Sequence, residues 1–231
     1  MTATDGTRLA YFGRLEITWD RPHDEPEQWT TAIARWAASL LPLLPQGPVL
    51  DLGDGACHVG LLAVAGTRRS LVCLAESEGG EDVALANARR NGLAEQVTVV
   101  GAPSATDDRG YALVLGPVGG PVAQIAALRI AARFLGEGGA LLLPLTGHPS
   151  EDTELLARAH DHGLTETERR DLESNGAVLF RRSRDVEAGL NDHVVVSTHD
   201  SRSPGTVRHG THVPSRAPSH PPATDDTLEE H

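Results

Sequence analysis

The sequence contains no lysine, and all 20 of its basic side chains are arginine. Against 32 acidic residues, these arginines leave a formal net charge of −12. A chain this acidic lacks the positive surface that neutralises phosphate groups, so general nucleic-acid binding is not expected. The charge balance favours a small molecule or a protein as partner.

Cysteine and long apolar runs are also scarce. Cys57 and Cys73 are too few for a disulfide framework or a four-cysteine zinc site, so a reducing cytoplasm is the expected location. No apolar run approaches the roughly 20 residues that cross a bilayer. The N-terminus has no basic start followed by an apolar stretch. We expect neither a membrane span nor a secretory signal.

Composition changes near residue 185, after which proline, serine and histidine accumulate. Residues 185–231 have too little apolar surface to offset the entropy of ordering them, so a disordered tail is predicted. The histidines of this segment are irregularly spaced and no cysteine accompanies them, which favours a solvated tail over a metal site. The expected parts are an N-terminal flap or hairpin (1–26), a folded domain (27–184) and the tail.

Within the folded domain, apolar runs alternate with helical patterns. Five buried strands are predicted at 48–52, 70–75, 97–100, 111–115 and 140–145. Helices are predicted at 27–44, 58–65, 81–91, 122–135 and 151–162, and the glycine-rich residues 136–139 are expected to close the fourth of these. Two further strands, near 165–172 and 177–182, form a predicted terminal hairpin. This order indicates an α/β fold whose parallel sheet binds ligands at the carboxyl ends of its strands.

The segment from Val49 to His58 is the most informative. A buried strand leads there into a turn that contains Gly53 and Gly55, and a helix follows. Glycines let a ligand approach the backbone closely, and the amides that open a helix favour negative groups. The dinucleotide fingerprint fails because its third glycine falls on His58, which disfavours a nicotinamide-dependent oxidoreductase. Asp51, two residues before the first glycine, suits a ligand with a positively charged amine.

The residues 51–57, DLGDGAC, resemble the D-x-G-x-G-x-G motif of class I S-adenosylmethionine-dependent methyltransferases. Segments that resemble later elements of that superfamily follow in order at 81–93, 97–101, 111–115 and 134–143. Within the superfamily, the chain looks closest to the compact branch of release-factor and ribosomal-protein methyltransferases. The resemblance implies a Rossmann-like seven-stranded sheet, mostly parallel with a C-terminal antiparallel hairpin, and S-adenosylmethionine as cofactor.

The resemblance also implies cofactor-binding positions. Gly53 and Gly55 would let the methionine part of the cofactor lie against the turn, which Asp51 would hold while facing the cofactor's amino group. Glu76 would accept hydrogen bonds from the ribose hydroxyls, with a solvated loop acid as the alternative. The implied set of cofactor-binding residues is Asp51, Leu52, Gly53, Gly55, Glu76 and Ala102.

Several positions depart from the pattern of the superfamily. Cys57 replaces the third glycine, and a small packed side chain is favoured there over a nucleophile because no general base is evident. Ala102 stands where an acid usually binds the adenine amine. Residues 116–119 replace the N-P-P-Y element, which argues against methylation of glutamine or adenine nitrogen. A pair of glutamates typical of arginine methyltransferases is also missing.

Methyl transfer from a sulfonium is an in-line displacement, so positioning supplies much of the catalysis. A base is needed only when the acceptor must lose a proton. The candidate bases are Asp20, His23, His58 and His148, of which His58 is expected rather to cap or pack the start of its helix. No catalytic residue is assigned from the sequence.

The aromatic residues near the N-terminus are notable because aromatics make up only 3% of the chain. Tyr11, Phe12 and Trp19 form either a lid or acceptor wall, or a small packed hairpin. Acceptor contacts are expected at Trp19, Gly116 and Pro117. The predicted function is transfer of a methyl group to a small metabolite or a protein, and the alternative is a catalytically silent binding or assembly subunit with the same fold.

Overall fold

The computed structural model describes residues 8–19, 25–53, 55–77, 79–102, 110–146, 149–172 and 175–182. The predicted tail at 185–231 lies outside these ranges, as do three of the candidate bases, Asp20, His23 and His148. Among the residues described, no helix has both the length and the apolar character needed to cross a membrane.

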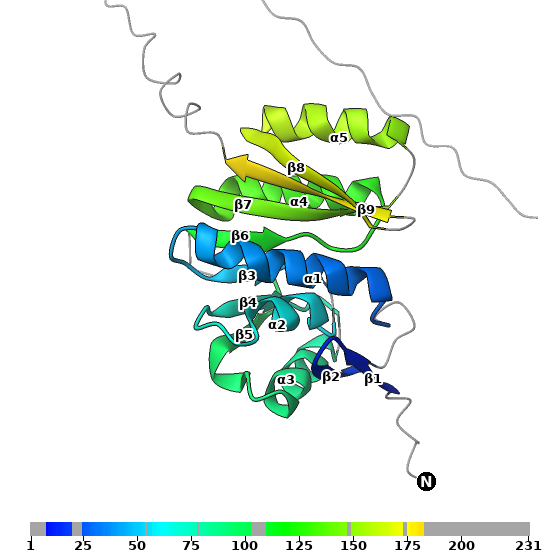
Figure 1. Ribbon diagram of the computed structural model, residues 1–231, viewed down its shortest axis with the longest axis vertical. Coiled ribbons are helices and arrows are strands. Elements are labelled where there is room, and N and C mark those ends of the chain that lie inside the picture. The colour runs from blue at the N-terminus through cyan, green and yellow to red at the C-terminus, as the bar shows by residue number, and fades with distance from the viewer. Residues whose placement is uncertain are drawn as a thin grey trace, which may run out of the picture. The chain divides into compact units, whose positions relative to one another are not determined.

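A seven-stranded sheet in the order β5-β4-β3-β6-β7-β9-β8 forms the centre of the domain. Strands β3 to β7 pair in parallel, whereas β9 pairs antiparallel with both β7 and β8 (Figure 1). The mostly parallel sheet with a C-terminal antiparallel hairpin is therefore confirmed. The strands are β3 (Val49–Asp51), β4 (Leu71–Leu74), β5 (Val97–Val100), β6 (Tyr111–Leu115), β7 (Leu135–Leu145), β8 (Leu164–Leu172) and β9 (Asn175–Arg182).

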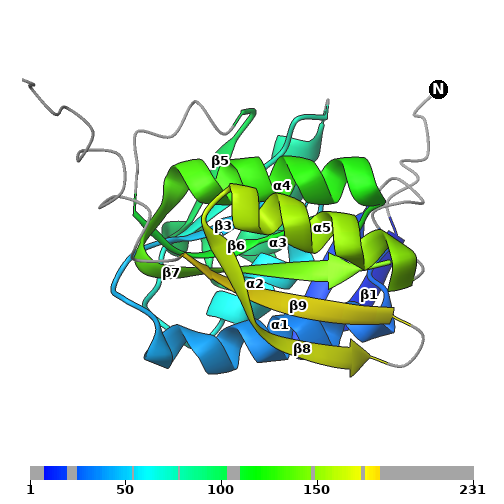
Figure 2. The same cartoon turned by 90° about the horizontal axis from the view of Figure 1, so that it is seen from above.

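Helices cover both faces of the sheet. Figure 2 shows α4 and α5 on one side and α1, α2 and α3 on the other. Two short 3-10 helices, η2 and η3, follow α1 and precede β5. The bounds are α1 (Gln28–Leu40), η2 (Leu41–Leu43), α2 (His58–Val64), α3 (Gly80–Arg90), η3 (Ala94–Gln96), α4 (Pro121–Phe134) and α5 (Pro149–Asp161).

The sheet divides the apolar core into two clusters. Successive strand residues point to opposite faces, so Val49 packs with α1 and α2 while Leu50 packs with the residues of α4. In α1, the three- and four-residue spacing of Trp29, Ile33 and Trp36 places these side chains on one buried face. Burial on both faces explains why the strands appear in the sequence as short, continuous apolar runs.

Two predicted helix ends were wrong: the helix predicted at 27–44 ends at Leu40, where a 3-10 helix follows, and the end of the fourth helix was also misplaced. Residues 136–139 do not close a helix ahead of the fifth strand, because β7 already begins at Leu135. The glycines are needed for a close approach to the neighbouring backbone: a β-carbon on Gly139 would lie 2.7 Å from the Tyr111 carbonyl oxygen. The pairing of β6 with β7 shifts register at this place, between Tyr111 and Leu113.

An antiparallel hairpin precedes the domain. Its strands are β1 (Arg8–Phe12) and β2 (Leu15–Trp19), and Gly13 has a φ of 59° in the turn between them. Phe12 and Trp19 are buried, whereas Tyr11 is 75% exposed. The hairpin lies beside α3, to which β2 is joined by side-chain hydrogen bonds (Figure 1).

Candidate functional site

The carboxyl ends of four parallel strands meet at one edge of the sheet. β3 lies between β4 and β6, and β5 lies on the far side of β4. Pairing continues just past the strand ends, because the Leu52 amide donates to the Leu115 carbonyl at 3.0 Å and the Ala75 amide to the Val100 carbonyl at 2.9 Å. The segments that begin at Leu52, Ala75, Gly101 and Gly116 therefore leave the sheet at the same edge, where α/β proteins bind their ligands.

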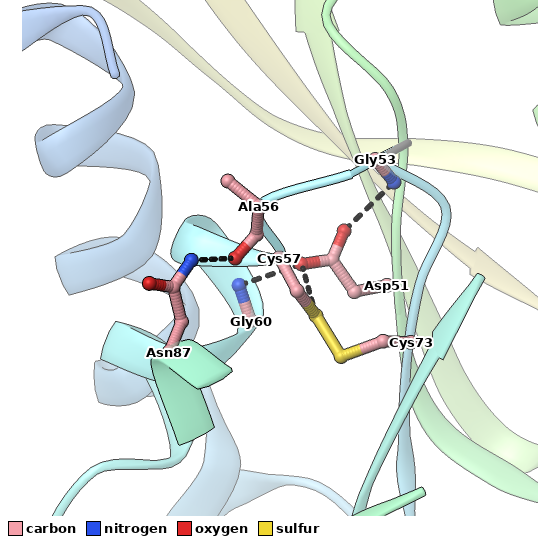
Figure 3. Close-up of a disulfide and its surroundings, with 7 residues drawn as sticks. All are labelled: Asp51, Gly53, Ala56, Cys57, Gly60, Cys73 and Asn87. Carbon is pink, nitrogen blue, oxygen red and sulfur yellow. Dashed lines mark hydrogen bonds between the residues drawn. A yellow bond between two sulfur atoms is a disulfide. The ribbon is translucent and has the colours of Figure 1, made fainter. Parts of the chain in front are cut away.

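Asp51 holds the loop that follows β3. One oxygen of its carboxylate, Oδ1, accepts a hydrogen bond from the Gly53 amide at 2.9 Å, and Oδ2 accepts one from the Gly60 amide at 2.7 Å (Figure 3). The side chain is only 2% exposed. Asp51 thus joins the beginning of the loop to the first turn of α2, across the residues between them.

Burial dominates the electrostatics of this carboxylate. Removal from water raises the pKa of Asp51 to about 6, although the hydrogen bonds from the Gly53 and Gly60 amides act in the opposite direction. Two amides are too few to compensate for the lost hydration. At neutral pH the group is mainly ionised, which matches its acceptor-only role.

The third residue of α2, Gly60, has to be a glycine because of its contact with Asp51. A β-carbon at Gly60 would lie 2.6 Å from Asp51 Oδ2 and 2.9 Å from a methyl carbon of Leu71. Because the first of these atoms is fixed by its hydrogen bonds, a larger residue would push α2 away from β3. The conformation of the D-x-G motif therefore depends on a further glycine, Gly60, which was not predicted from the sequence.

The loop ends in two residues with left-handed backbone. Gly55 has a φ of 95°, and Cys57, the N-cap of α2, has φ 54° and ψ 24°. Cys57 is the only non-glycine residue with a positive φ in the described part of the chain. It occupies the position of the third glycine of the motif and adopts a conformation for which glycine is better suited.

Cys57 is not a free, packed thiol as expected. It forms a disulfide with Cys73 of β4, with a Cα–Cα distance of 6.1 Å (Figure 3). The two cysteines are 16 residues apart in the sequence, and they meet because β4 pairs with β3 and places Cys73 beside Asp51. Two cysteines build no framework, but they suffice for this one cross-link.

The other predicted cofactor-binding positions lie along the same edge. Glu76, two residues beyond β4, is exposed, and Ala102, two residues beyond β5, is partly buried. Leu52 is 6% exposed and belongs to the apolar core on the α4 side of the sheet. Asp54, inside the motif, lies outside the described ranges.

The predicted acceptor contacts come from two elements. Gly116 and Pro117 follow β6 directly and are both partly buried. Trp19 ends β2 and is 4% exposed, and its indole N–H has no hydrogen-bond partner among the described residues. Phe12 and Trp19 are thus buried, which agrees with a small packed hairpin rather than with a lid or acceptor wall.

Asn87 joins the hairpin to the loop, a role that was not predicted from the sequence. Its side-chain amide nitrogen donates to the carbonyl oxygens of Thr18 and Ala56, at 2.9 and 3.0 Å. Its side-chain oxygen accepts from the Thr18 amide and hydroxyl, both at 2.8 Å. Asn91, one turn later, forms the same kind of pair with the amide and carbonyl of Glu16. The signal in the sequence was two asparagines four residues apart on the inner face of a helix.

His58 packs at the start of α2, as expected. Its ring meets the Phe12 ring edge-on, with 4.7 Å between the centroids. Burial lowers the pKa of His58 to about 4, because the charged imidazolium loses hydration. A base with so low a pKa is poorly matched to proton abstraction at neutral pH. Within the described ranges, no group of three His, Cys, Asp or Glu residues is arranged to hold a metal ion.

Comparison with known proteins identifies the class of the fold. No protein-family model matches the sequence. No curated protein matches it closely enough to count as a relative. Solved structures, in contrast, match with a probability of 1.00, and several of them carry the name of a methyltransferase or methylase. The chain has the fold of the class I S-adenosylmethionine-dependent methyltransferases.

Three of these structures show the range of the likeness. The chain resembles TYW2 from M. jannaschii, solved in complex with AdoMet, with a TM-score of 0.58 and 11% identity over 78% of this chain and 87% of that one. It resembles ribosomal protein L11 methylase from Lactobacillus delbrueckii subsp. bulgaricus with a TM-score of 0.59 and 14% identity over 68% and 80%. The cyclase SpnF matches with a TM-score of 0.57 and 13% identity over 71% and 86%. Because one of the three is a cyclase, the fold by itself does not define the reaction.

Proposed function

We propose that the chain is a methyltransferase that takes its methyl group from S-adenosylmethionine and passes it to a small metabolite or a protein. The observation that carries the proposal is the Asp51–Gly60 connection. It folds the glycine-containing loop back at the carboxyl edge of a parallel sheet, the same edge at which the segment with the exposed Glu76 leaves the neighbouring strand β4. The AdoMet complex of the similar TYW2 structure supports the choice of ligand.

The residues at this edge fit an adenosyl group. Gly53 is partly exposed and carries no side chain, so the methionine part of the cofactor can lie against its backbone. Glu76 offers an exposed carboxylate that suits a pair of ribose hydroxyls. Ala102, at the end of the next strand, would contact the adenine. Asp51 is nearly inaccessible and acts by holding the loop.

When bound, the cofactor would supply an electrophilic methyl group on a positively charged sulfur. This chain's contribution would be to hold the acceptor atom in line with that methyl group and to exclude water. Gly116 and Pro117 follow the central strand β6 and would line the acceptor side. Neither Asp51, which is fully bonded, nor His58, which has a pKa near 4, is suited to remove a proton from the acceptor. We infer an acceptor atom that is already nucleophilic at neutral pH.

Titration of the full-length oxidised chain with S-adenosylhomocysteine in a calorimeter tests the proposal. We expect saturable one-to-one binding that the Glu76→Gln substitution weakens by about tenfold, because a charge-assisted pair of hydrogen bonds is lost. Glu95→Gln is the matched control, since Glu95 is exposed in η3 at the opposite end of β5. Absence of binding at millimolar ligand would overturn the proposal.

A catalytically silent binding or assembly subunit is the second candidate. It is favoured by the bonding of both oxygens of Asp51 inside the loop, which leaves no free carboxylate for the cofactor's amino group. Transfer of a labelled methyl group to any acceptor by the purified monomer excludes this candidate. A chain that co-purifies with a partner and does not bind the cofactor supports it.

A further inference from the structure

The Cys57–Cys73 disulfide connects the two segments that would meet the cofactor. Cys57 ends the loop after β3, and Cys73 lies in β4, three residues before Glu76. In Figure 3 the disulfide lies beside the Asp51 carboxylate, under the loop. A change in this bond therefore acts on both sides of the proposed site.

The backbone at Cys57 gives the cross-link a specific effect. A residue with a β-carbon is disfavoured at φ 54°, so a free cysteine at this position would move toward another conformation. The disulfide opposes that movement because it fixes the side chain to β4, an inner strand of the sheet. The Cys57 carbonyl also accepts a hydrogen bond from the Leu61 amide at 3.0 Å, so the start of α2 moves with the loop.

Reduction also changes the surroundings of Asp51. Cys57 Sγ lies 3.6 Å from Asp51 Oδ2, and a disulfide sulfur carries no hydrogen to donate across that distance. A Cys57 thiol has such a hydrogen and competes with the Gly60 amide for the same oxygen. The dithiol form therefore has a second way to arrange the loop.

We propose that Cys57–Cys73 is a redox-modification site that controls cofactor affinity: the disulfide holds the loop in its binding conformation, and the dithiol releases it. This inference rests on the proposed function. An external dithiol is the reductant. One of its thiolates attacks a disulfide sulfur to give a mixed disulfide and a cysteine thiolate, and its second thiol closes the ring of the oxidised reagent. Two electrons and two protons pass to Cys57 and Cys73.

Because the disulfide is buried, its reduction requires the loop to open first. Cys57 is 3% exposed and Cys73 is fully buried, so the reductant reaches the sulfur atoms only when the loop opens. A ligand that rests on the loop must slow that opening. Because coupling between two sites is reciprocal, the form that binds the cofactor more tightly is also the form that the cofactor protects.

The test compares oxidised and dithiol-reduced full-length protein, with the redox state of each verified by mass. The affinity for S-adenosylhomocysteine is measured by calorimetry, and the hydrogen exchange of a peptide that spans residues 55–62 is measured without ligand. We expect reduction to weaken binding by about fivefold, the factor that corresponds to the cost of left-handed backbone at a non-glycine residue. We expect faster exchange in the same peptide. Saturating S-adenosylhomocysteine should slow reduction by a similar factor.

Two double variants isolate the conformational effect. Cys57→Gly with Cys73→Ala has no cross-link but adopts the left-handed backbone freely, so it should bind like the oxidised chain. Cys57→Ala with Cys73→Ala differs from it by one methyl group and should bind like the reduced chain. Neither should respond to the reductant.

Equal affinities of the oxidised and reduced chains, or equal affinities of the two variants, would overturn the inference. If no form binds the nucleoside, the proposed function is refuted, and with it the proposed control of cofactor affinity. In that case the exchange data still decide whether the disulfide orders the loop.

Discussion

Asn87 donates a hydrogen bond to the carbonyl oxygen of Ala56 at 3.0 Å and so connects the middle of α3 to the loop that carries the D-x-G-x-G motif. The same side chain is bonded to the amide, hydroxyl and carbonyl of Thr18 in the hairpin. It is fully buried. One amide therefore fixes the position of the hairpin, with Trp19 at its end, relative to the proposed cofactor loop.

The substitution Asn87→Ala should destabilise the protein by about 3 kcal/mol, because it leaves buried backbone groups of Thr18 and Ala56 without partners. Urea unfolding measures the loss. Asn91→Ala is the control: Asn91 makes similar bonds to Glu16 but is partly exposed, so water replaces them and the loss should be near 1 kcal/mol. Equal losses for the two variants would contradict the linking role of Asn87.

Gly60→Ala should lower the free energy of unfolding by about 2 kcal/mol, because the added methyl group overlaps the Asp51 carboxylate and Leu71. It should also weaken binding of S-adenosylhomocysteine, since α2 has to move away from β3. Gly101→Ala is the matched control, as nothing lies within 4 Å of a β-carbon there. Equal tolerance of both alanines in thermal unfolding would show that the first turn of α2 is not tightly held.

Asp51 and His58 should oppose each other in the pH dependence of stability. The pKa of Asp51 is raised from 3.8 to about 6 in the folded state. The stabilisation of the folded state that this group provides is therefore present below pH 4 and is lost as the pH rises through 6. The pKa of His58 is lowered from 6.5 to about 4. The stabilisation that this group provides is therefore present above pH 6.5 and is lost as the pH falls through 4. Each effect amounts to about 3 kcal/mol at most, and that of His58 is the smaller because part of its side chain meets water.

Single substitutions separate the two effects. Between pH 4 and 6.5, Asp51→Asn should become more stable relative to the wild type as the pH rises, and His58→Gln should become less stable relative to it. Urea unfolding at intervals of half a pH unit gives the slopes. An Asp51→Asn slope that matches the wild type would show that the Asp51 carboxylate titrates at its ordinary pKa.

Arg69, which is partly buried, should contribute strongly to the stability of the folded protein. Its guanidinium donates to four backbone carbonyl oxygens around the end of α1 and η2, those of Leu41, Leu44, Pro45 and Gly47, at 2.6 to 3.2 Å. A lysine carries its three donors on one nitrogen and cannot reach all four carbonyls, so Arg69→Lys should cost about 2 kcal/mol in urea unfolding. The neighbouring Arg68 is exposed, and Arg68→Lys should be neutral. A neutral Arg69→Lys would contradict the role of these bonds.

Much of the fold follows from short-range patterns in the sequence. The strands at 97–100 and 111–115 have the predicted bounds, because an apolar run buried on both faces ends where polar residues begin. The start of β7 was missed because its glycines resemble a helix stop, whereas their role is to let two backbones approach. That role depends on the neighbouring strand and has no local pattern.

The site was predictable as a position but not as a set of contacts. The turn after Asp51 could be located from spacing alone, because an acid and two glycines follow a buried strand. The disulfide and the Asn87 bonds could not, since they join residues 16 and 69 positions apart that only the sheet pairing and the hairpin bring together. The roles of Glu76, Ala102, Gly116 and Pro117 remain predictions.

A crystal structure of the oxidised chain grown with S-adenosylhomocysteine tests the central claim most directly. We predict electron density for the nucleoside at the carboxyl edge of β3 and β4, with the ribose hydroxyls on Glu76 and the homocysteine part along Gly53. Density that shows this space filled by the protein's own side chains, with no nucleoside at saturating concentration, would contradict the account and leave only the fold.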